Sequence, residues 1–196
     1  MTMAKATGPV FNVPFRRRRD ALTNYARRLA LVKSGKPRMV VSKSLTSVTV
    51  QFVKFANKGD EVLAGANSAE LKKLGWSPRR NLPTAYLTGA LAAKRAGKKG
   101  VGEFVLDTGL STASKSSLAY GAAKGALDAG LKTGLSNDAV DMARVRGEHI
   151  AKYAESLKNT GKYEKLFSAY LKEGMHPEKL PEKFDAVKEK VMKGGA

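Results

Sequence analysis

Cysteine is absent from the 196-residue sequence, and histidine occurs only at His149 and His176. The absence of thiols excludes disulfides, thiolate metal sites and a cysteine nucleophile. The two histidines lack the spacing of metal ligands, so no zinc site is expected. No apolar run approaches the roughly 20 residues that a membrane span requires, and the first residues lack the apolar stretch of a secretory signal peptide. These absences are typical of a cytoplasmic protein, and we expect no membrane partner.

Acidic residues are scarce, with 17 Asp and Glu against 36 Lys and Arg and a formal net charge of +19. The imbalance is uneven along the chain. Residues 1–38 hold ten basic residues and one acid, residues 39–100 hold eleven and three, and residues 101–196 hold fifteen and thirteen. Such a charge predicts a polyanionic partner, with nucleic acid favoured over an anionic membrane surface. The hydrophobic fraction of 42% still allows a buried core, so the first half is expected to bind the polyanion and the second to serve as scaffold.

Four consecutive arginines, Arg16–Arg19, form the densest basic cluster in the chain. Guanidinium groups pair bidentately with phosphates, and each neutralised phosphate releases condensed counterions. With one acid in the first 38 residues, little scope for internal salt bridges is expected. Phe11, Phe15 and Tyr25 lie among these charges and could stack on bases, although Tyr25 also fits the apolar stripe of a helix. We therefore predict that this segment contacts RNA or DNA.

The first 37 residues are predicted to form a basic N-terminal arm followed by a helix. Residues 1–15 contain glycine and proline without a helical period, which is typical of an extended segment. From Phe15 onward, apolar residues recur every three or four positions, so one continuous helix is expected up to Gly35. The apolar stripe would face the core while the arginines project away from it. The stripe consists of Leu22, Tyr25, Leu29 and Val32.

The rest of the chain is predicted to form an α/β domain followed by helices. Residues 38–66 contain three runs rich in β-branched and aromatic residues separated by short turns, which indicates an antiparallel three-stranded meander. Helix, strand and helix patterns follow, so the predicted sheet is mixed. The next helical pattern covers residues 138–158. The predicted organisation is a basic arm and helix at 1–37, an α/β RNA-binding domain at 38–135 and a helical region at 136–196 that packs on the domain or extends from it.

An enzyme acting on nucleic acid is the alternative. The segment GLSTASKS at 109–116 follows a predicted strand and precedes a predicted helix, as in an NTPase phosphate-binding loop, but Ser114 stands where that motif requires glycine. Asp107, Asp128 and Asp141 could be imagined as ligands of a metal-dependent nuclease. Asp128 and Asp141 fit capping or helix-surface roles equally well. Since no site has a complete set of groups, we expect neither catalysis nor a cofactor.

Eight segments, in sequence order, resemble the archaeal and eukaryotic form of the eighteenth universal large-subunit ribosomal protein. The similarity covers nearly the whole chain, and the length resembles that of the archaeal members. The segments are GPVFNVPFRRRRDALTNYARRLALVKSGKPRMVV at 8–41, GD at 59–60, GW at 75–76, NLPTAYLTG at 81–89, LDTGL at 106–110, GALDAGL at 125–131, RGEHIAKYA at 146–154 and LPEKFD at 180–185.

This resemblance implies a ribonuclease-H-like sheet topology without catalysis. It also implies binding to 5S rRNA and its attachment to large-subunit rRNA in the central protuberance, beside neighbouring ribosomal proteins. RNA contacts in this family lie in the arginine-rich arm, in the helix that follows and on the sheet. The matching positions are Arg16, Arg17, Arg18, Arg19, Asn24, Tyr25, Arg27, Arg28, Lys33, Lys36, Arg38 and Lys43.

Overall fold

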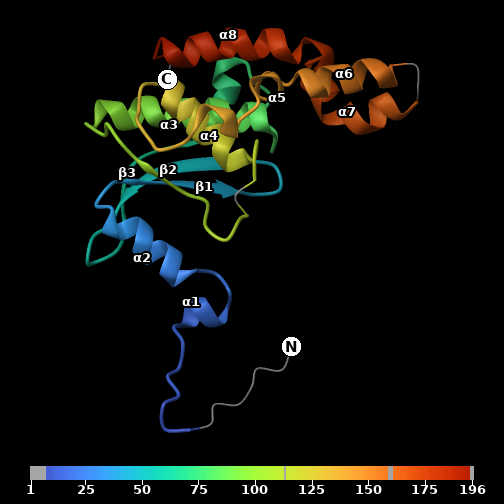
Figure 1. The fold of residues 1–196 in the computed structure, drawn as a ribbon. Coiled ribbons are helices and arrows are strands. Elements are labelled where there is room, and N and C mark those ends of the chain that lie inside the picture. Colours follow the sequence, from blue (N-terminus) through green and yellow to red (C-terminus); the bar gives the residue numbers. More distant parts are fainter. Residues whose placement is uncertain (1–7, 113, 159–160, 195–196) are drawn as a thin grey trace.

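Four strands form a mixed sheet in the computed structural model, which describes residues 8–112, 114–158 and 161–194 (Figure 1). Strands β1 (Arg38–Lys43), β2 (Val48–Lys54) and β3 (Glu61–Asn67) are antiparallel neighbours. Strand β4 (Val105–Asp107) pairs parallel with β1, which gives the order β3-β2-β1-β4. The predicted three-stranded meander and the mixed sheet are therefore confirmed.

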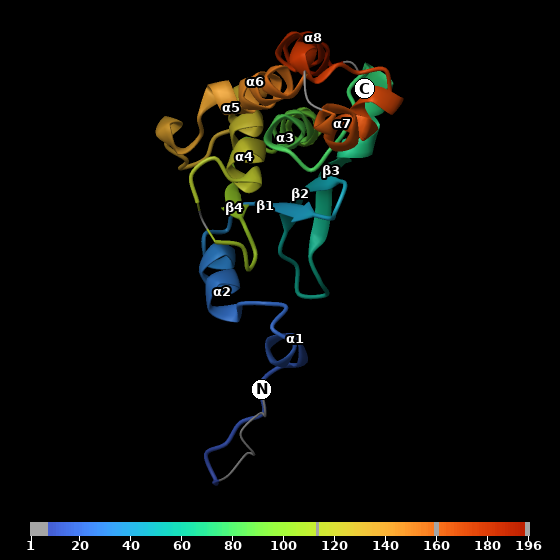
Figure 2. The same ribbon diagram turned by 90° about the vertical axis from the view of Figure 1, so that its right-hand side faces the viewer.

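Helices α3 (Leu82–Lys98) and α4 (Leu118–Asp128) cover one face of this sheet (Figures 1 and 2). Alternate residues of each strand point to that face, and in β2 these are the fully buried Val48, Val50 and Phe52. This period of two is what the β-branched run in the sequence predicts. The short 3-10 helix η1 (Ser68–Leu74) connects the end of β3 to the loop that precedes α3.

The contact between α3 and α4 is made backbone to backbone. A Cβ atom added at Gly89 would lie 2.1 Å from the carbonyl oxygen of Ala122, and one added at Gly125 would lie 2.1 Å from that of Tyr86. Only glycine fits at these two positions, because any side chain would push the helices apart. The alanine- and glycine-rich sequence of α4 is therefore explained by close packing.

The C-terminal helices lie on the side of α3 that faces away from the sheet. Helix α8 (Leu180–Met192) runs alongside α3, while α6 (Glu148–Leu157) and α7 (Lys162–Lys172) lie at one end of this layer (Figure 1). Phe184 of α8 is 1% exposed, and its ring centroid lies 5.4 Å from that of Tyr86. In the described part of the chain, no helix is long and apolar enough to cross a membrane.

The predicted single helix over 138–158 is wrong. The short 3-10 helix η2 (Asn137–Ala139) is followed by α5 (Met142–Arg146), and Gly147 then separates α5 from α6. Gly147 has φ 84°, and a Cβ there would lie 2.1 Å from Leu180 Cδ2, so the chain turns at a position that strongly favours glycine. A further 3-10 helix, η3 (Pro177–Lys179), precedes α8.

The predicted continuous helix from Phe15 to Gly35 is also wrong. The structure contains a four-residue helix α1 (Arg16–Arg19) and a separate helix α2 (Tyr25–Lys33). Asn24 starts α2 because its side chain accepts a hydrogen bond from Arg27 N at 3.1 Å. The chain leaves the helical conformation after α1, because Ala21 has φ 51° and lies in the left-handed region. The described part of the predicted arm, residues 8–15, is exposed and without regular structure, whereas residues 1–7 lie outside the described residues.

The apolar stripe predicted for this helix does not reach the core. Leu22 and Leu29 are 55% and 56% exposed, and α2 contains no buried residue. The reason is the position of α2, which lies on the side of the sheet opposite α3 and α4 (Figure 2). No second helical layer covers this side among the described residues, so the stripe has little to pack against.

Candidate nucleic-acid interface

The four arginines of α1 lie far from the core, below the sheet in the view of Figure 1. All four are exposed, and within the described ranges none of them forms an ion pair. Arg17 Nε donates a hydrogen bond to Thr23 Oγ1 at 2.8 Å, which joins α1 to the segment before α2. The charges of these side chains are therefore presented to solvent without an internal counter-charge.

Three predicted residues at the start of α2 have structural contacts of their own. Asn24 caps the helix, and its side-chain amide nitrogen is not used by that hydrogen bond. The half-buried ring of Tyr25 lies 5.2 Å from the ring of Phe15, centroid to centroid. Arg27 Nη1 donates to the carbonyl oxygen of Gly109 at 3.1 Å. These contacts fix the beginning of α2 relative to α1 and to the loop after β4.

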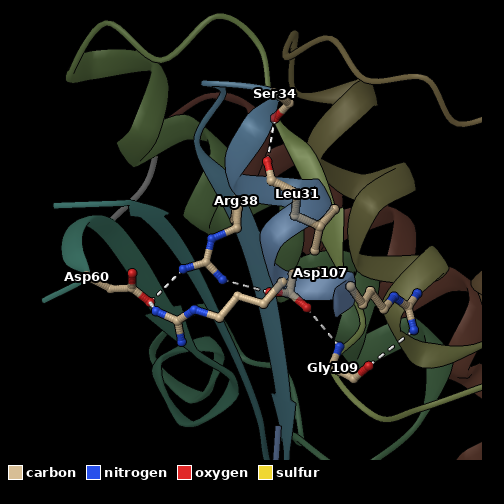
Figure 3. Close-up of polar contacts among 8 residues, drawn as sticks. Leu31, Ser34, Arg38, Asp60, Asp107 and Gly109 are labelled. Carbon is tan, nitrogen blue, oxygen red and sulfur yellow. Dashed lines mark hydrogen bonds and ion pairs between the residues drawn. The ribbon is translucent and has the colours of Figure 1, made fainter. Parts of the chain in front are cut away.

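Arg28, Arg38, Asp60 and Asp107 form a set of ion pairs that we call the Arg38 network (Figure 3). Arg38 Nη1 lies 2.8 Å from Asp107 Oδ2, and Arg38 Nη2 lies 2.5 Å from Asp60 Oδ2. Arg28 Nη2 approaches the same Asp60 oxygen at 2.9 Å. Asp107 Oδ1 also accepts a hydrogen bond from the backbone N–H of Gly109 at 2.9 Å. The network thus joins α2, the first strand, the β2–β3 turn and the end of β4.

The expectation that the first 38 residues have little scope for internal salt bridges is wrong for Arg28, Lys36 and Arg38. Their acidic partners are residues 60, 103 and 107, which lie much later in the sequence. The side chain of Arg38 is 4% exposed and both of its terminal nitrogens are occupied. In this conformation its guanidinium group is not available to a phosphate, so the structure places Arg38 beneath the basic surface.

The predicted lysines lie at the edges of the same region. Lys33 at the end of α2 and Lys43 at the end of β1 are exposed, and neither has an ion pair among the residues described. Lys36 Nζ lies 2.6 Å from Glu103 Oε2, and this contact lowers the pKa of Glu103. Both side chains of that pair are about half exposed, so water and salt screen the attraction. All three lysines remain accessible to an anionic partner.

A row of polar side chains crosses the sheet on the face opposite α3. Ser42 of β1, Thr49 of β2 and Asn67 of β3 are paired in register across the strands. Asn67 Nδ2 donates to Thr49 Oγ1 at 2.8 Å. All three are half-buried or exposed and offer hydroxyl and amide groups. These three residues were not predicted individually from the sequence, although the alternation of polar and apolar residues along β2 was the available signal.

The carboxylates considered for a nuclease site do not come together. Asp107 belongs to the Arg38 network, and Asp141 caps α5 by accepting from Ala143 N at 2.9 Å. Asp128 accepts a 2.6 Å hydrogen bond from the hydroxyl of Tyr86, and burial together with this bond raises the pKa of Tyr86. The described residues contain no group of three or more His, Asp or Glu side chains placed to hold a metal ion. The structural roles considered for Asp128 and Asp141 are therefore confirmed.

Ser116, at the end of the serine-rich segment 109–116, also has a structural role, whereas residue 113 of that segment lies outside the described residues. The hydroxyl oxygen of Ser116 accepts a hydrogen bond from Asp141 N at 3.2 Å, and the N–H of Ser116 donates to the carbonyl oxygen of Ala139 at 2.9 Å. These contacts bind the segment to the chain between α4 and α5. The serine that a phosphate-binding loop would use is thus engaged within the protein.

Comparison with known proteins identifies the family. Residues 10–103 match the family described as ribosomal large subunit proteins 60S L5 and 50S L18. The chain is 50% identical to large ribosomal subunit protein uL18 of Thermofilum pendens, with 95% of this chain and 97% of the relative covered. It is 49% identical to uL18 of Korarchaeum cryptofilum (92% and 94% covered) and 46% identical to uL18 of Saccharolobus solfataricus (97% and 98% covered). The chain therefore belongs to the uL18 family of large-ribosomal-subunit proteins.

Proposed function

We propose that this protein is a structural component of the large ribosomal subunit that binds 5S rRNA and attaches it to the large-subunit rRNA in the central protuberance. The observation that carries the proposal is the exposed arginine run of α1, which has no internal counter-charge among the described residues and extends away from the core. Such a segment matches the phosphate backbone of RNA in charge and in reach. The protein would act on the ribosome in the cytoplasm, beside neighbouring ribosomal proteins.

The predicted RNA-binding residues divide into two groups by accessibility. Exposed residues without a side-chain hydrogen bond or an ion pair would contact phosphates directly. Residues held in hydrogen bonds, ion pairs or ring contacts would first have to exchange a partner or would act by holding the others in place. The first group comprises Arg16, Arg18, Arg19, Lys33 and Lys43, and the second comprises Arg17, Asn24, Tyr25, Arg27, Arg28, Lys36 and Arg38.

The polar row on the sheet would extend this interface. Hydroxyl and amide groups suit contacts to ribose and phosphate oxygens as well as to base edges. The division into a basic arm and helix at 1–37, an RNA-binding α/β domain at 38–135 and a helical region at 136–196 is part of the proposal. We also propose a ribonuclease-H-like topology, which the order β3-β2-β1-β4 and the parallel β4 support. Catalysis is not proposed, because the carboxylates that could serve it have structural roles.

The test is a salt titration of binding to 5S rRNA and to an unrelated structured RNA of similar length. We expect a preference for 5S rRNA and a log–log slope of about −0.7 to −0.9 per phosphate neutralised. Replacing Arg16–Arg19 by alanine should weaken binding and reduce the magnitude of the log–log salt slope by roughly three. The melting temperature should hardly change, because these side chains are exposed.

A matched control removes four positive charges from the opposite end of the molecule. Lys152, Lys162, Lys165 and Lys172 are exposed residues of α6 and α7, and their replacement by alanine should affect binding much less. Equal affinity for both RNAs would contradict the 5S assignment. Equal effects of the two fourfold variants would contradict a local role for α1, and metal-dependent cleavage of the RNA would favour the nuclease alternative instead.

A further inference from the structure

Helix α2 is held in place with limited apolar packing. It has no buried residue, Leu29 is 56% exposed, and its other large apolar side chains, Tyr25, Leu31 and Val32, are only half-buried. A nine-residue helix is too short to be stable by itself in water, so its position depends on contacts with the rest of the protein. Because no side chain of α2 is fully buried, polar groups must supply a substantial part of those contacts.

The polar contacts of α2 converge on two carboxylates. Asp60 in the β2–β3 turn accepts both Arg28 of α2 at 2.9 Å and Arg38 of β1 at 2.5 Å. Asp107 accepts the other terminal nitrogen of Arg38 at 2.8 Å. The second oxygen of Asp107 holds the N–H of Gly109, whose carbonyl oxygen in turn accepts from Arg27 of α2. Each carboxylate is thus linked to one arginine of the helix.

Burial fixes the positions of these side chains more firmly than a surface ion pair would. The side chain of Arg38 is 4% exposed and that of Asp107 is 13% exposed, whereas Arg28 and Asp60 are 35% and 26% exposed. The buried arginine cannot leave its partners without losing charge compensation in a poorly solvated place. Arg38 therefore fixes both carboxylates, and they in turn set the position of α2 on the sheet.

We propose that Asp60 and Asp107 are positioning residues for the RNA-binding surface. They hold α2 against the sheet, and through α2 they set the direction in which α1 presents its arginines. The proposal rests on the proposed function for its effect on RNA. It explains why two acidic residues lie inside the most basic part of the protein, where a negative charge by itself would repel phosphates.

The direction in which RNA affinity changes distinguishes a positioning role of these acids from a simple electrostatic effect of their charge. Removal of an acidic residue raises the net charge of the protein, so electrostatic attraction alone predicts tighter binding. Loss of positioning predicts weaker binding, because only the fraction of molecules with α2 in place would be competent. Glu61 offers a matched control, since it is an exposed acid next to Asp60 and has no ion pair among the described residues.

The experiment compares Asp60→Asn with Glu61→Gln in the full chain. Each variant removes one negative charge at nearly the same place, but only the first disrupts the Arg38 network. We expect Asp60→Asn to bind 5S rRNA roughly three- to tenfold more weakly than the unaltered protein, as loss of charge-assisted hydrogen bonds reduces the population with α2 in place. Glu61→Gln should bind equally well or up to about twofold more tightly.

Amide hydrogen exchange of the free protein gives a second readout that needs no RNA. In Asp60→Asn, the amides of α2 should exchange faster, while those of α3 in the core should keep their rates. In Glu61→Gln both helices should be unchanged. Faster exchange in α3 to the same degree would show a general loss of stability and would overturn the positioning role.

The two readouts separate failure of this inference from failure of the proposed function. Tighter RNA binding by Asp60→Asn with α2 still protected would overturn the inference and leave 5S binding intact. If the unaltered protein shows no preference for 5S rRNA, the proposed function fails. In that case the exchange rates still decide whether Asp60 holds α2, since selective loss of α2 protection supports it and retained protection refutes it.

Discussion

Gly125→Ala should be strongly destabilising because α3 and α4 touch backbone to backbone. The added Cβ would lie 2.1 Å from the carbonyl oxygen of Tyr86 and 3.0 Å from the backbone nitrogen of Ala90. Ordinary contact between carbon and oxygen requires more than 3 Å, so the helices must separate by about 1 Å along this line. The separation would loosen the packing of a helix pair that lies directly on the sheet. We expect a loss of about 2–4 kcal/mol in the free energy of unfolding, from overpacking.

Equilibrium unfolding in urea measures this loss, and Gly97→Ala is the control. Gly97 is an exposed residue near the end of α3, and an added Cβ there would have nothing within 4 Å. Alanine should raise stability at that position by roughly 0.5–1 kcal/mol, because it has the higher helix propensity. A Gly125→Ala variant within about 0.5 kcal/mol of the unaltered protein would refute the described helix contact, since surface substitutions have effects of that size.

Two further predictions concern the junction between α3 and the C-terminal helices. The hydroxyl of Ser77 and the guanidinium of Arg79 hold the pKa of Glu173 below its usual range. The ionised carboxylate therefore stabilises the folded protein at a pH above the ordinary carboxyl pKa. This stabilisation is lost as the pH falls through the lowered pKa of Glu173. Glu173→Gln should therefore be less stable near pH 7 and less sensitive to acid, and urea unfolding at about pH 7 and about pH 3 checks both effects. Asn81 caps α3 and donates to the Tyr170 hydroxyl at 2.9 Å, so Asn81→Ala should lower the melting temperature and cost about 1–2 kcal/mol. Asn81→Asp keeps the cap acceptor and should recover part of that loss, and no difference between the two variants would contradict the capping role.

The sheet was predictable because its sequence signals are local. Each strand carries its own alternation, and short turns between three such segments leave an antiparallel meander as the simplest pairing. The glycines and alanines of α4 indicate close packing on a sheet. The backbone contact with α3 was not predictable from them, because Gly125 meets the carbonyl oxygen of Tyr86, a residue of the preceding helix.

For the N-terminal helix, the apolar periodicity gave a wrong prediction of burial. Leu22, Tyr25, Leu29 and Val32 have the spacing of a core-facing stripe, yet the structure places them on a side of the sheet with little to cover them. A periodic pattern predicts which residues share a face, but a partner for that face depends on the tertiary arrangement. The capping residue Asn24 was visible in the sequence and marks the true start of α2.

Ion pairs between residues that are distant in the sequence could not be predicted from the sequence. Asp107 meets Arg38 because β4 pairs parallel with β1, with Val40 opposite Asp107 in the register. Residues two apart on a strand share a face, which places the two charged side chains together. The number of acidic residues close in sequence does not reveal this pairing. The run Arg16–Arg19, by contrast, was predicted to bind a polyanion from its local composition alone.

The placement of charge in the fold follows from the short range of electrostatic attraction in salt. At physiological ionic strength the Debye length is about 8 Å, less than the diameter of one helix. Helices α6 to α8 lie beyond α3 from the basic segment, so lysines there would add little attraction to RNA bound at α1 and α2 (Figure 1). They would still repel one another. Acidic residues offset part of the positive charge in this half of the chain, as in the pairs Arg146–Asp185 at 2.5 Å and Lys158–Glu178 at 3.5 Å, while the arginines of α1 have no ion pair among the described residues.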